Sequence, residues 1–223
     1  MTNKMPVTKT EPVLDNSKIT DRFDPHGEIK KLKSEIPSGI SRKINSASKE
    51  KLSKGLKLSY PCKINDFPDS APVNMVVEFT QLSINMPYEK FLARLAPAAW
   101  GKSLAGYIGG EVQVIEKDRQ NRPVKQIERM VLKAPIKRLD MTKSEVIVYE
   151  ENKATVYWRV YHSDNKTTKP DIGYVEFGPL DKDTTRITFH SAHKLYLPNF
   201  MVRIILAGTF MKYLRNYRKI VTG

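Results

Sequence analysis

The chain contains 223 residues with a formal net charge of +14, and 40% of its residues are hydrophobic, which suits one substantial domain with an appendage. Its single cysteine, Cys62, excludes an intramolecular disulfide framework, and its polar N-terminal stretch lacks the apolar segment of a signal peptide. The longest apolar stretch, residues 200–211, contains Arg203 and is too short to span a bilayer. We therefore expect a soluble, cytoplasmic protein.

Residues 1–72 are expected to form a basic, largely disordered arm. They are rich in Lys, Ser, Pro and Asn with scattered single aliphatic residues, a composition that buries too little surface to offset chain entropy. Residues 28–36 and 48–58 are weak helix candidates, and Pro37 would end the first of them. The sequence therefore places a boundary near residue 72 and assigns residues 73–223 to one folded domain.

Strands and two short helices follow along this domain. The weak apolar alternation of residues 75–84 predicts a first strand, and Pro87 then occupies the first position of a helix. Pro97 ends that helix and begins a second short one near residues 98–105. Polar and glycine-rich turns separate six further strands, expected at residues 111–117, 124–133, 144–150, 153–163, 171–178 and 184–195.

The last element is a long amphipathic helix from Asn199 to about Val221. Residues spaced by three or four positions form an apolar stripe on it, comprising Val202, Leu206, Phe210, Tyr213, Tyr217 and Ile220. Each such side chain contributes about 1.5–3 kcal/mol when buried, so the stripe must lie against another element, and the preceding sheet is the obvious candidate. The elements together predict an α+β fold, in which a curved antiparallel sheet of about seven strands wraps around the helix.

The basic residues of this helix have three interpretations. Residues 200–223 carry five Lys or Arg and no acid. They form an ordinary solvated face, a weak contact with an anionic membrane surface, or a nucleic-acid site. No recognition-helix pattern or zinc-knuckle spacing accompanies the charge, so no specific nucleic-acid partner is expected. The membrane interpretation rests on the arm and on Lys212, Arg215 and Lys219.

The order of strand, two short helices, six strands and long helix has a family likeness. The segments that carry it are Met75–Ile84, PYEKFLARL (Pro87–Leu95), GGEVQVIEKD (Gly109–Asp118), TVYWRVYHSD (Thr155–Asp164), DIGYVEFGPL (Asp171–Leu180), TRITFHSAHKL (Thr185–Leu195) and the terminal helix. Residues 73–221 resemble the START-like superfamily, also called SRPBCC or helix-grip, in element order and not in a catalytic signature. The resemblance implies a cavity between sheet and helix for an apolar small molecule or lipid, in transport or sensing, without a cofactor.

Strand alternation predicts which side chains face that cavity. Residues two apart share a face, and Arg159 is costly to bury unpaired, so the Trp158 face of its strand is expected to point inward. The predicted ligand-binding residues are Trp100, Trp158, His162, Phe177, Phe189, Ser191, His193 and Phe210. Alternatively, these side chains fill a solid core, and the fold presents only a surface for protein interactions.

The histidines leave an enzymatic alternative open. His162 or His193 in an apolar cavity could act as an acid–base group, as the resemblance to cyclases and dehydratases of the superfamily implies. No G-x-S-x-G motif marks a nucleophilic serine. A metal site is not expected, because His190 and His193 are three apart on a strand and point to opposite faces.

Overall fold

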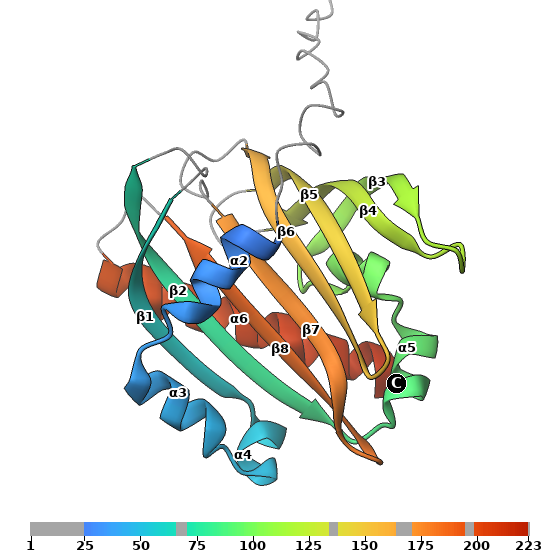
Figure 1. Ribbon diagram of the computed structural model, residues 1–223, viewed down its shortest axis with the longest axis horizontal. Helices are drawn as coiled ribbons and strands as arrows, with labels where there is room; N and C mark the ends of the chain where they lie inside the picture. The colour runs from blue at the N-terminus through green and yellow to red at the C-terminus, as the bar shows by residue number, and fades with distance from the viewer. Residues whose placement is uncertain (1–24, 66–70, 134–137, 164–170, 195–198, 223) are drawn as a thin grey trace, which may run out of the picture.

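The computed structural model describes residues 25–65, 71–133, 138–163, 171–194 and 199–222, which form one antiparallel sheet with helices on both faces (Figure 1). Eight strands of these ranges lie in the order β1-β2-β8-β7-β6-β5-β4-β3. The strands are β1 (Leu56–Asn65), β2 (Pro72–Ile84), β3 (Tyr107–Lys117), β4 (Pro123–Lys133), β5 (Arg138–Glu150), β6 (Lys153–Ser163), β7 (Asp171–Asp181) and β8 (Thr184–His193). The sheet has one strand more than expected, because β1 precedes the first predicted strand.

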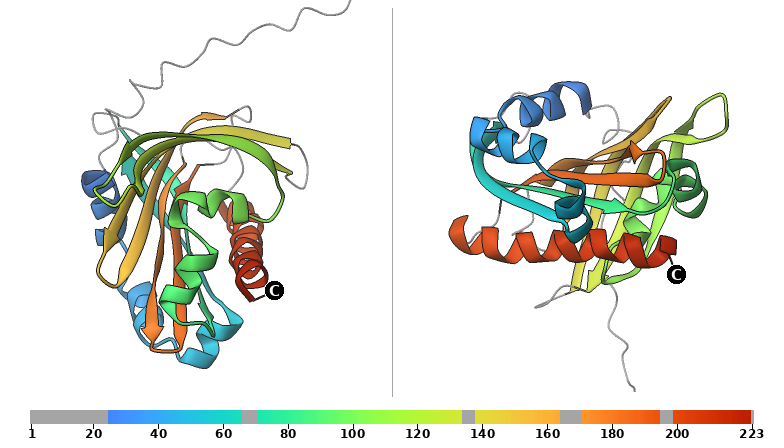
Figure 2. Two further views of the ribbon diagram at one scale, coloured as in Figure 1. Left: turned by 90° about the vertical axis from the view of Figure 1, so that its right-hand side faces the viewer. Right: turned by 90° about the horizontal axis from the view of Figure 1, so that it is seen from below.

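The long helix α6 (Asn199–Thr222) lies on the inner side of the curved sheet, as Figure 2 shows. After β2, the short helix α5 (Tyr88–Arg94) and the 3-10 helix η1 (Pro97–Ser103) pack beside α6. This arrangement confirms the expected α+β helix-grip fold. In the described ranges, no helix is both long enough and apolar enough to cross a membrane.

Helix α6 buries an apolar stripe against the sheet, but the stripe differs slightly from the predicted one. The buried side chains of its second half are Phe210, Met211, Leu214, Tyr217 and Val221. Ile220 was predicted to be buried but is 45% exposed, because the stripe continues from Tyr217 to Val221. The predicted side chains of Val202 and Leu206 lie outside the described part of the helix.

The segment that precedes residue 72 contains regular structure from Pro25 onward. The helices α2 (Pro25–Ser34), α3 (Ser38–Asn45) and α4 (Lys49–Lys54) lead into β1, and β1 pairs with β2 along its whole length. This corrects the expectation of a largely disordered arm for residues 25–65; residues 1–24 lie outside the described ranges. The expected boundary near residue 72 therefore separates two paired strands of one sheet.

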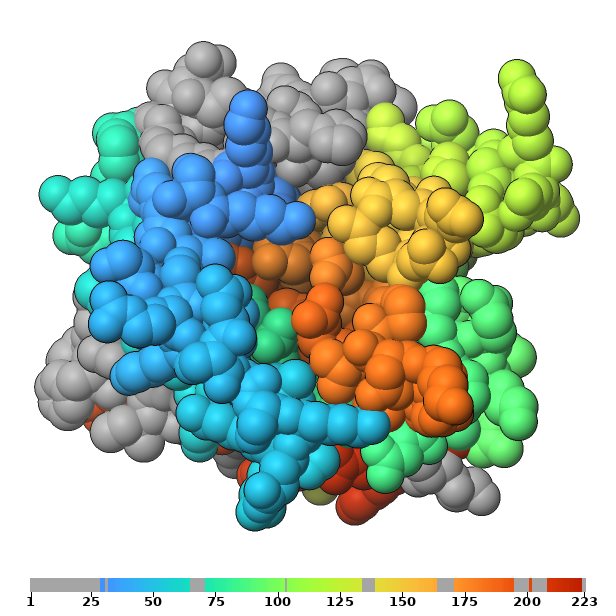
Figure 3. Space-filling model, turned by 60° about the horizontal axis from the view of Figure 1, so that its bottom comes forward, coloured from blue at the N-terminus to red at the C-terminus, as the bar shows by residue number. Residues whose placement is uncertain are grey.

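A second apolar core on the outer face of the sheet explains why residues 25–65 are folded. Ile29 and Leu32 of α2 are 1% and 0% exposed, and they pack over Tyr60 of β1 and Tyr174 of β7. In β1, the buried Leu56, Tyr60, Cys62 and Ile64 alternate with polar residues and Pro61. Figure 3 shows α2, α3 and α4 (blue) packed against the strands as one continuous surface.

Arg159 lies on this outer face of β6, yet its side chain is only 1% exposed. The orientation of the strand is as expected, since Val156 and Trp158 face the inner core. The assumption that the Arg159 face is open to solvent was wrong. Because α2 also packs against β6 and β7, this sheet buries side chains on both faces.

Candidate functional site

A cavity of about 110 Å³ lies between the inner face of the sheet, η1 and the second half of α6. Its walls are mainly apolar and include Trp100 of η1, Trp158 of β6, Phe189 of β8 and Phe210 of α6. The side chains of Lys143, Asp171 and His193 also reach the wall. An apolar enclosure with a few convergent polar groups is the usual form of a small-molecule site.

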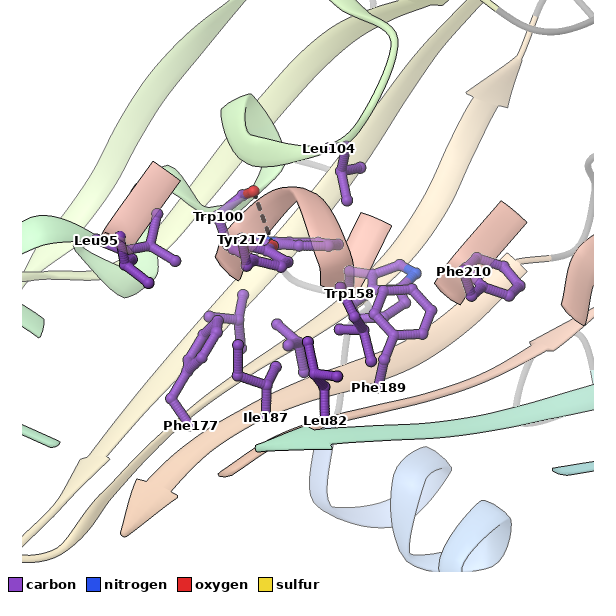
Figure 4. Close-up of a cluster of buried hydrophobic side chains, with 14 of the residues drawn as sticks. Leu82, Leu95, Trp100, Leu104, Trp158, Phe177, Ile187, Phe189, Phe210 and Tyr217 are labelled. Atoms are coloured by element: carbon purple, nitrogen blue, oxygen red, sulfur yellow. Dashed lines mark hydrogen bonds between the residues drawn. The ribbon is translucent and has the colours of Figure 1, made fainter. Parts of the chain in front are cut away.

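The aromatic side chains of the cavity wall lie against one another (Figure 4). The ring centroids of Trp100 and Trp158 are 4.8 Å apart, and those of Trp158 and Phe189 are 4.9 Å apart. The rings of Phe189 and Phe210 are stacked with their centroids at 4.7 Å. Tyr217 Oη donates a hydrogen bond of 2.9 Å to the Trp100 carbonyl oxygen, which ties η1 to α6.

A buried cation lies in the wall beside Trp100. Lys143 of β5 is 1% exposed, and its Nζ lies 2.8 Å from a carboxylate oxygen of Glu128 and 2.8 Å from one of Glu145. The same Nζ lies 3.8 Å from the centroid of the Trp100 ring, which is a cation–π distance. Glu145 also accepts hydrogen bonds from Trp100 Nε1 (2.6 Å) and Gln126 Nε2. The register of β4 and β5 sets Glu128 opposite Lys143, so the sheet itself forms the pair.

Burial and the neighbouring charges shift the pKa values of Glu128 and Lys143. Burial raises the pKa of Glu128; the charge of Lys143 opposes this, while that of Glu145 adds to it. Burial alone would lower the pKa of Lys143, but Glu128 and Glu145 together raise it. The ammonium is therefore held charged in an apolar wall. Gly101 of η1 leaves room for the cluster, because a Cβ there would collide with the Glu128 carboxylate.

A second polar group lies between β7 and β8. Ser191 Oγ is 2.6 Å from His193 Nε2, and Asp171 Oδ2 is 3.2 Å from His193 Nδ1. Asp171 Oδ1 accepts a hydrogen bond of 3.0 Å from Trp158 Nε1, and the His193 ring stacks on Phe210. The order serine, histidine, aspartate is that of a hydrolase triad, in which the carboxylate orients the imidazole. Both ring nitrogens of His193 are engaged, so the imidazole is fixed in orientation.

The predicted site residues separate into two groups. Trp100, Trp158, Phe189, His193 and Phe210 line the cavity. The other three are absent from the described lining. Ser191 lies behind His193, Phe177 packs between Phe91 and Tyr217, and His162 is half-buried near the end of β6.

Sequence reasoning missed the charged residues Glu128, Lys143, Glu145 and Asp171. In β4 and β5 the signal was alternation, since residues two apart share a face of the strand. Glu128 therefore shares a face with Met130, and Lys143 and Glu145 lie between Met141 and Ile147 at two-residue spacing. The cost of burying charge argued against that orientation. Within the described ranges, no three His, Cys, Asp or Glu side chains converge as a metal ion would require.

Comparisons with known proteins agree with the fold. A START superfamily protein from Mycobacterium smegmatis aligns with a TM-score of 0.50 and 14% identity, over 65% of this chain and 96% of that one. Human StAR-related lipid transfer protein 5 aligns with a TM-score of 0.51 and 14% identity, over 74% of this chain and 81% of that one. No protein-family model matches the sequence, and no curated protein is similar enough to count as a match. The chain therefore has the START-like helix-grip fold.

Proposed function

We propose that this protein binds a small, mostly apolar molecule in the cavity between η1, the sheet and α6. The observation that carries the proposal is an aromatic enclosure with the Lys143 ammonium and the Asp171–His193 pair in its wall. The apolar wall would supply the affinity, and the charged groups would orient one polar group of the ligand. The name of one structural neighbour, a lipid transfer protein, supports an apolar ligand.

The cavity volume restricts the size of the ligand. Drug-sized ligands occupy pockets of about 300–1,000 Å³, whereas an engineered apolar cavity of about 150 Å³ holds benzene. The cavity of about 110 Å³ suits a molecule with a single ring or a short chain. A larger lipid would require η1 or α6 to move away from the sheet.

Tryptophan fluorescence provides a direct test of binding. The chain has two tryptophans, and both Trp100 and Trp158 line the cavity, so the whole emission reports on this site. Phenols of one ring and fatty acids of six to eight carbons are suitable probes, with native mass spectrometry to detect a ligand retained from cells. We expect saturable emission changes for at least one probe.

A matched pair of variants locates the binding. Leu139 and Leu92 are both partly buried leucines packed against the inner core, but only Leu139 lines the cavity. Leu139→Phe should therefore weaken binding while Leu92→Phe leaves it unchanged. Equal effects of the two variants, or no emission change and no retained ligand with the wild type, would overturn the proposal.

We further propose that α6 gives weak, salt-sensitive attraction to anionic membranes. Lys212, Arg215 and Lys219 are exposed on its outer face, whereas Arg218 is turned inward and donates to the carbonyl oxygens of Ser53 and Ser83. Each exposed cation contributes about 1 kcal/mol near an anionic surface. Replacing all three by Gln should therefore weaken binding to acidic vesicles by about 100-fold.

Vesicle co-sedimentation at low and physiological salt tests this attraction. The control replaces three exposed lysines elsewhere, Lys30, Lys57 and Lys63, by Gln, which removes the same charge. Equal losses in the two triple variants would assign the effect to net charge alone. Equal binding of the wild type to neutral vesicles would remove the electrostatic basis.

An acid–base activity is the second candidate function, and the contacts of His193 with Ser191 and Asp171 favour it. His193 lines the cavity and lies beside the Asp171 carboxylate. In the described contacts, His162 neither lines the cavity nor lies beside a carboxylate. His193 is therefore the better candidate for proton transfer to a bound ligand. If a substrate is found, His193→Gln should abolish turnover with ligand binding retained, and His162→Gln should have no effect. The opposite result would exclude this assignment.

A further inference from the structure

Exposed apolar side chains gather on one strand at the end of the sheet. Large hydrophobic residues with exposed side chains number five in the described ranges, and three of them are on β3. Ile108 is 57% exposed, Val114 is 39% exposed and Ile115 is 42% exposed. Isolated exposed apolar residues are common, but three on one strand mark an interaction surface.

The same strand has an open edge. Within the part of the chain that the structure describes, β3 pairs only with β4, so one row of its backbone N–H and C=O groups has no strand partner (Figure 1). The opposite edge strand, β1, contains Pro61 and the exposed Lys57 and Lys63, which hinder further strand pairing. Strand β3 contains no proline, and its one lysine is its last residue. Pairing is therefore expected at β3 and not at β1.

Strand β3 also contains a groove. The groove has a volume of about 300 Å³ and is lined by Ile108, Gly109, Gly110, Glu111, Arg129 and Val131. The groove is open at Gly109, where a Cβ would meet nothing within 4 Å, whereas a Cβ at Gly110 would collide with the backbone oxygen of Arg129. Strand β3 is thus open at Gly109, while its other half projects the exposed Val114 and Ile115.

We propose that two copies of this chain associate through β3, antiparallel, around a two-fold axis at Val112. In an antiparallel pair of strands, directly opposite side chains lie on the same face of the sheet. A two-fold axis perpendicular to the sheet must therefore pass midway between one residue and the same residue of the other copy. With the axis at Val112, Gly110 of each copy lies opposite Val114 of the other, and Gly109 opposite Ile115. Ile115 of each copy then lies at the groove beside Gly109 of its partner, while Val114 covers Gly110 on the other face of the sheet.

Charge and regularity both favour this register. An axis at Glu111 would set that carboxylate against its own copy, whereas an axis at Val112 sets it against Gln113. The pairing of β3 with β4 is regular from Gly109 to Val114 and shifts register on either side, so the dimer contact is centred on Gly110–Val114, with Gly109 and Ile115 at its ends. A contact this short is smaller than a standard stable interface, so we expect a dissociation constant in the micromolar range.

A cysteine substituted at the axis tests the register. In the proposed dimer Val112 lies opposite itself, at about 4.5–5.5 Å between Cα atoms, which is within disulfide range. Val112→Cys should therefore form a covalent dimer under mild oxidation, and Gln113→Cys, which would face Glu111, should form far less. The native Cys62 is buried, so the wild type should remain monomeric on a non-reducing gel. Equal cross-linking of both variants, or of neither, would overturn the register.

Sedimentation velocity of the full chain, from about 5 to about 200 µM, tests the association itself. The wild type should change from monomer to dimer over this range. Gly109→Val fills the groove without a clash inside one copy, and Val114→Lys replaces the projecting side chain, so each should weaken dimerisation at least tenfold. Ile220→Lys changes a similarly exposed residue on α6 and should have no effect. A wild type that stays monomeric, or a dimer indifferent to the β3 variants, would overturn the proposal.

Discussion

Removing the buried cation tests how the polar cluster between β4 and β5 is held. In Lys143→Met the side chain keeps roughly its volume, but Glu128 and Glu145 lose an ammonium that lies 2.8 Å from each. Breaking a buried ion pair from one side costs about 3–5 kcal/mol, because the remaining charge stays desolvated. Domains are typically stable by about 5–15 kcal/mol, so the substitution should remove a large part of the free energy of unfolding.

The pH dependence of this loss has a defined sign. The folded protein raises the pKa of Glu128, so it retains a proton that the unfolded chain has already released. The contribution of such a group to stability is complete below the ordinary carboxyl pKa and is lost as pH rises through the raised value. Without Lys143 the pKa of Glu128 should rise further. The destabilisation should therefore be larger at about pH 8 than at about pH 5.

Urea unfolding followed by tryptophan fluorescence measures both effects. The matched control is Lys143→Met combined with Glu128→Gln, which removes the carboxylate left without a cation while Glu145 keeps its bonds from Trp100 and Gln126. This double variant should regain part of the loss at pH 8 and little at pH 5. If Lys143→Met stays within about 1 kcal/mol of the wild type at both pH values, the ion pair does not hold the cluster together.

Two further predictions concern the outer core. Burial lowers the pKa of His190 to about 3, so the free energy of unfolding should fall as pH drops from about 6.5 towards 3. His190→Phe should flatten this pH dependence in acid-unfolding curves, and an unchanged curve would contradict the prediction. Leu32→Ala in α2 should lower the free energy of unfolding by about 2–5 kcal/mol, whereas Ile220→Ala should change it by less than about 0.5 kcal/mol. Similar values for the two variants would mean that α2 does not stabilise the domain.

The element order from Met75 onward was predictable because each part has a local signal. Apolar alternation indicated the strands, Pro87 and Pro97 indicated the starts of short helices, and the three- and four-residue spacing indicated α6. In the segment before Met75, only the weak helix candidates at residues 28–36 and 48–58 had a local signal, and they overlap α2 and α4, whereas α3 and β1 were not predicted. The few apolar residues of this segment, such as Ile29 and Leu32, are buried only because β7 and β8 offer a second apolar face.

The aromatic wall of the cavity was predictable, and its polar groups were not. Trp158 and Phe189 follow from strand alternation alone. Asp171 meets His193 because of an irregularity near Leu180, which shifts the register between β7 and β8 by one residue. Counting back from the turn without this shift would place Asp171 opposite Lys194. Such a shift carries no clear sequence signal, so the contact between Asp171 and His193 depends on information that only the fold contains.

Strands β7 and β8 contribute to both the inner and the outer core, so the cavity wall depends on the outer core as well. Strands β7 and β8 carry Phe177 and Phe189 on the inner face and Tyr174 and His190 on the outer face. His190 is held between the hydroxyl groups of Tyr60 and Tyr174, and the first of these comes from β1. A fragment that begins at residue 73 would lose β1 and α2 and expose the outer side chains of the strands that form the cavity wall. Ligand binding should therefore be measured on the full chain, because a failure of the shorter fragment would report on the outer core and not on the cavity.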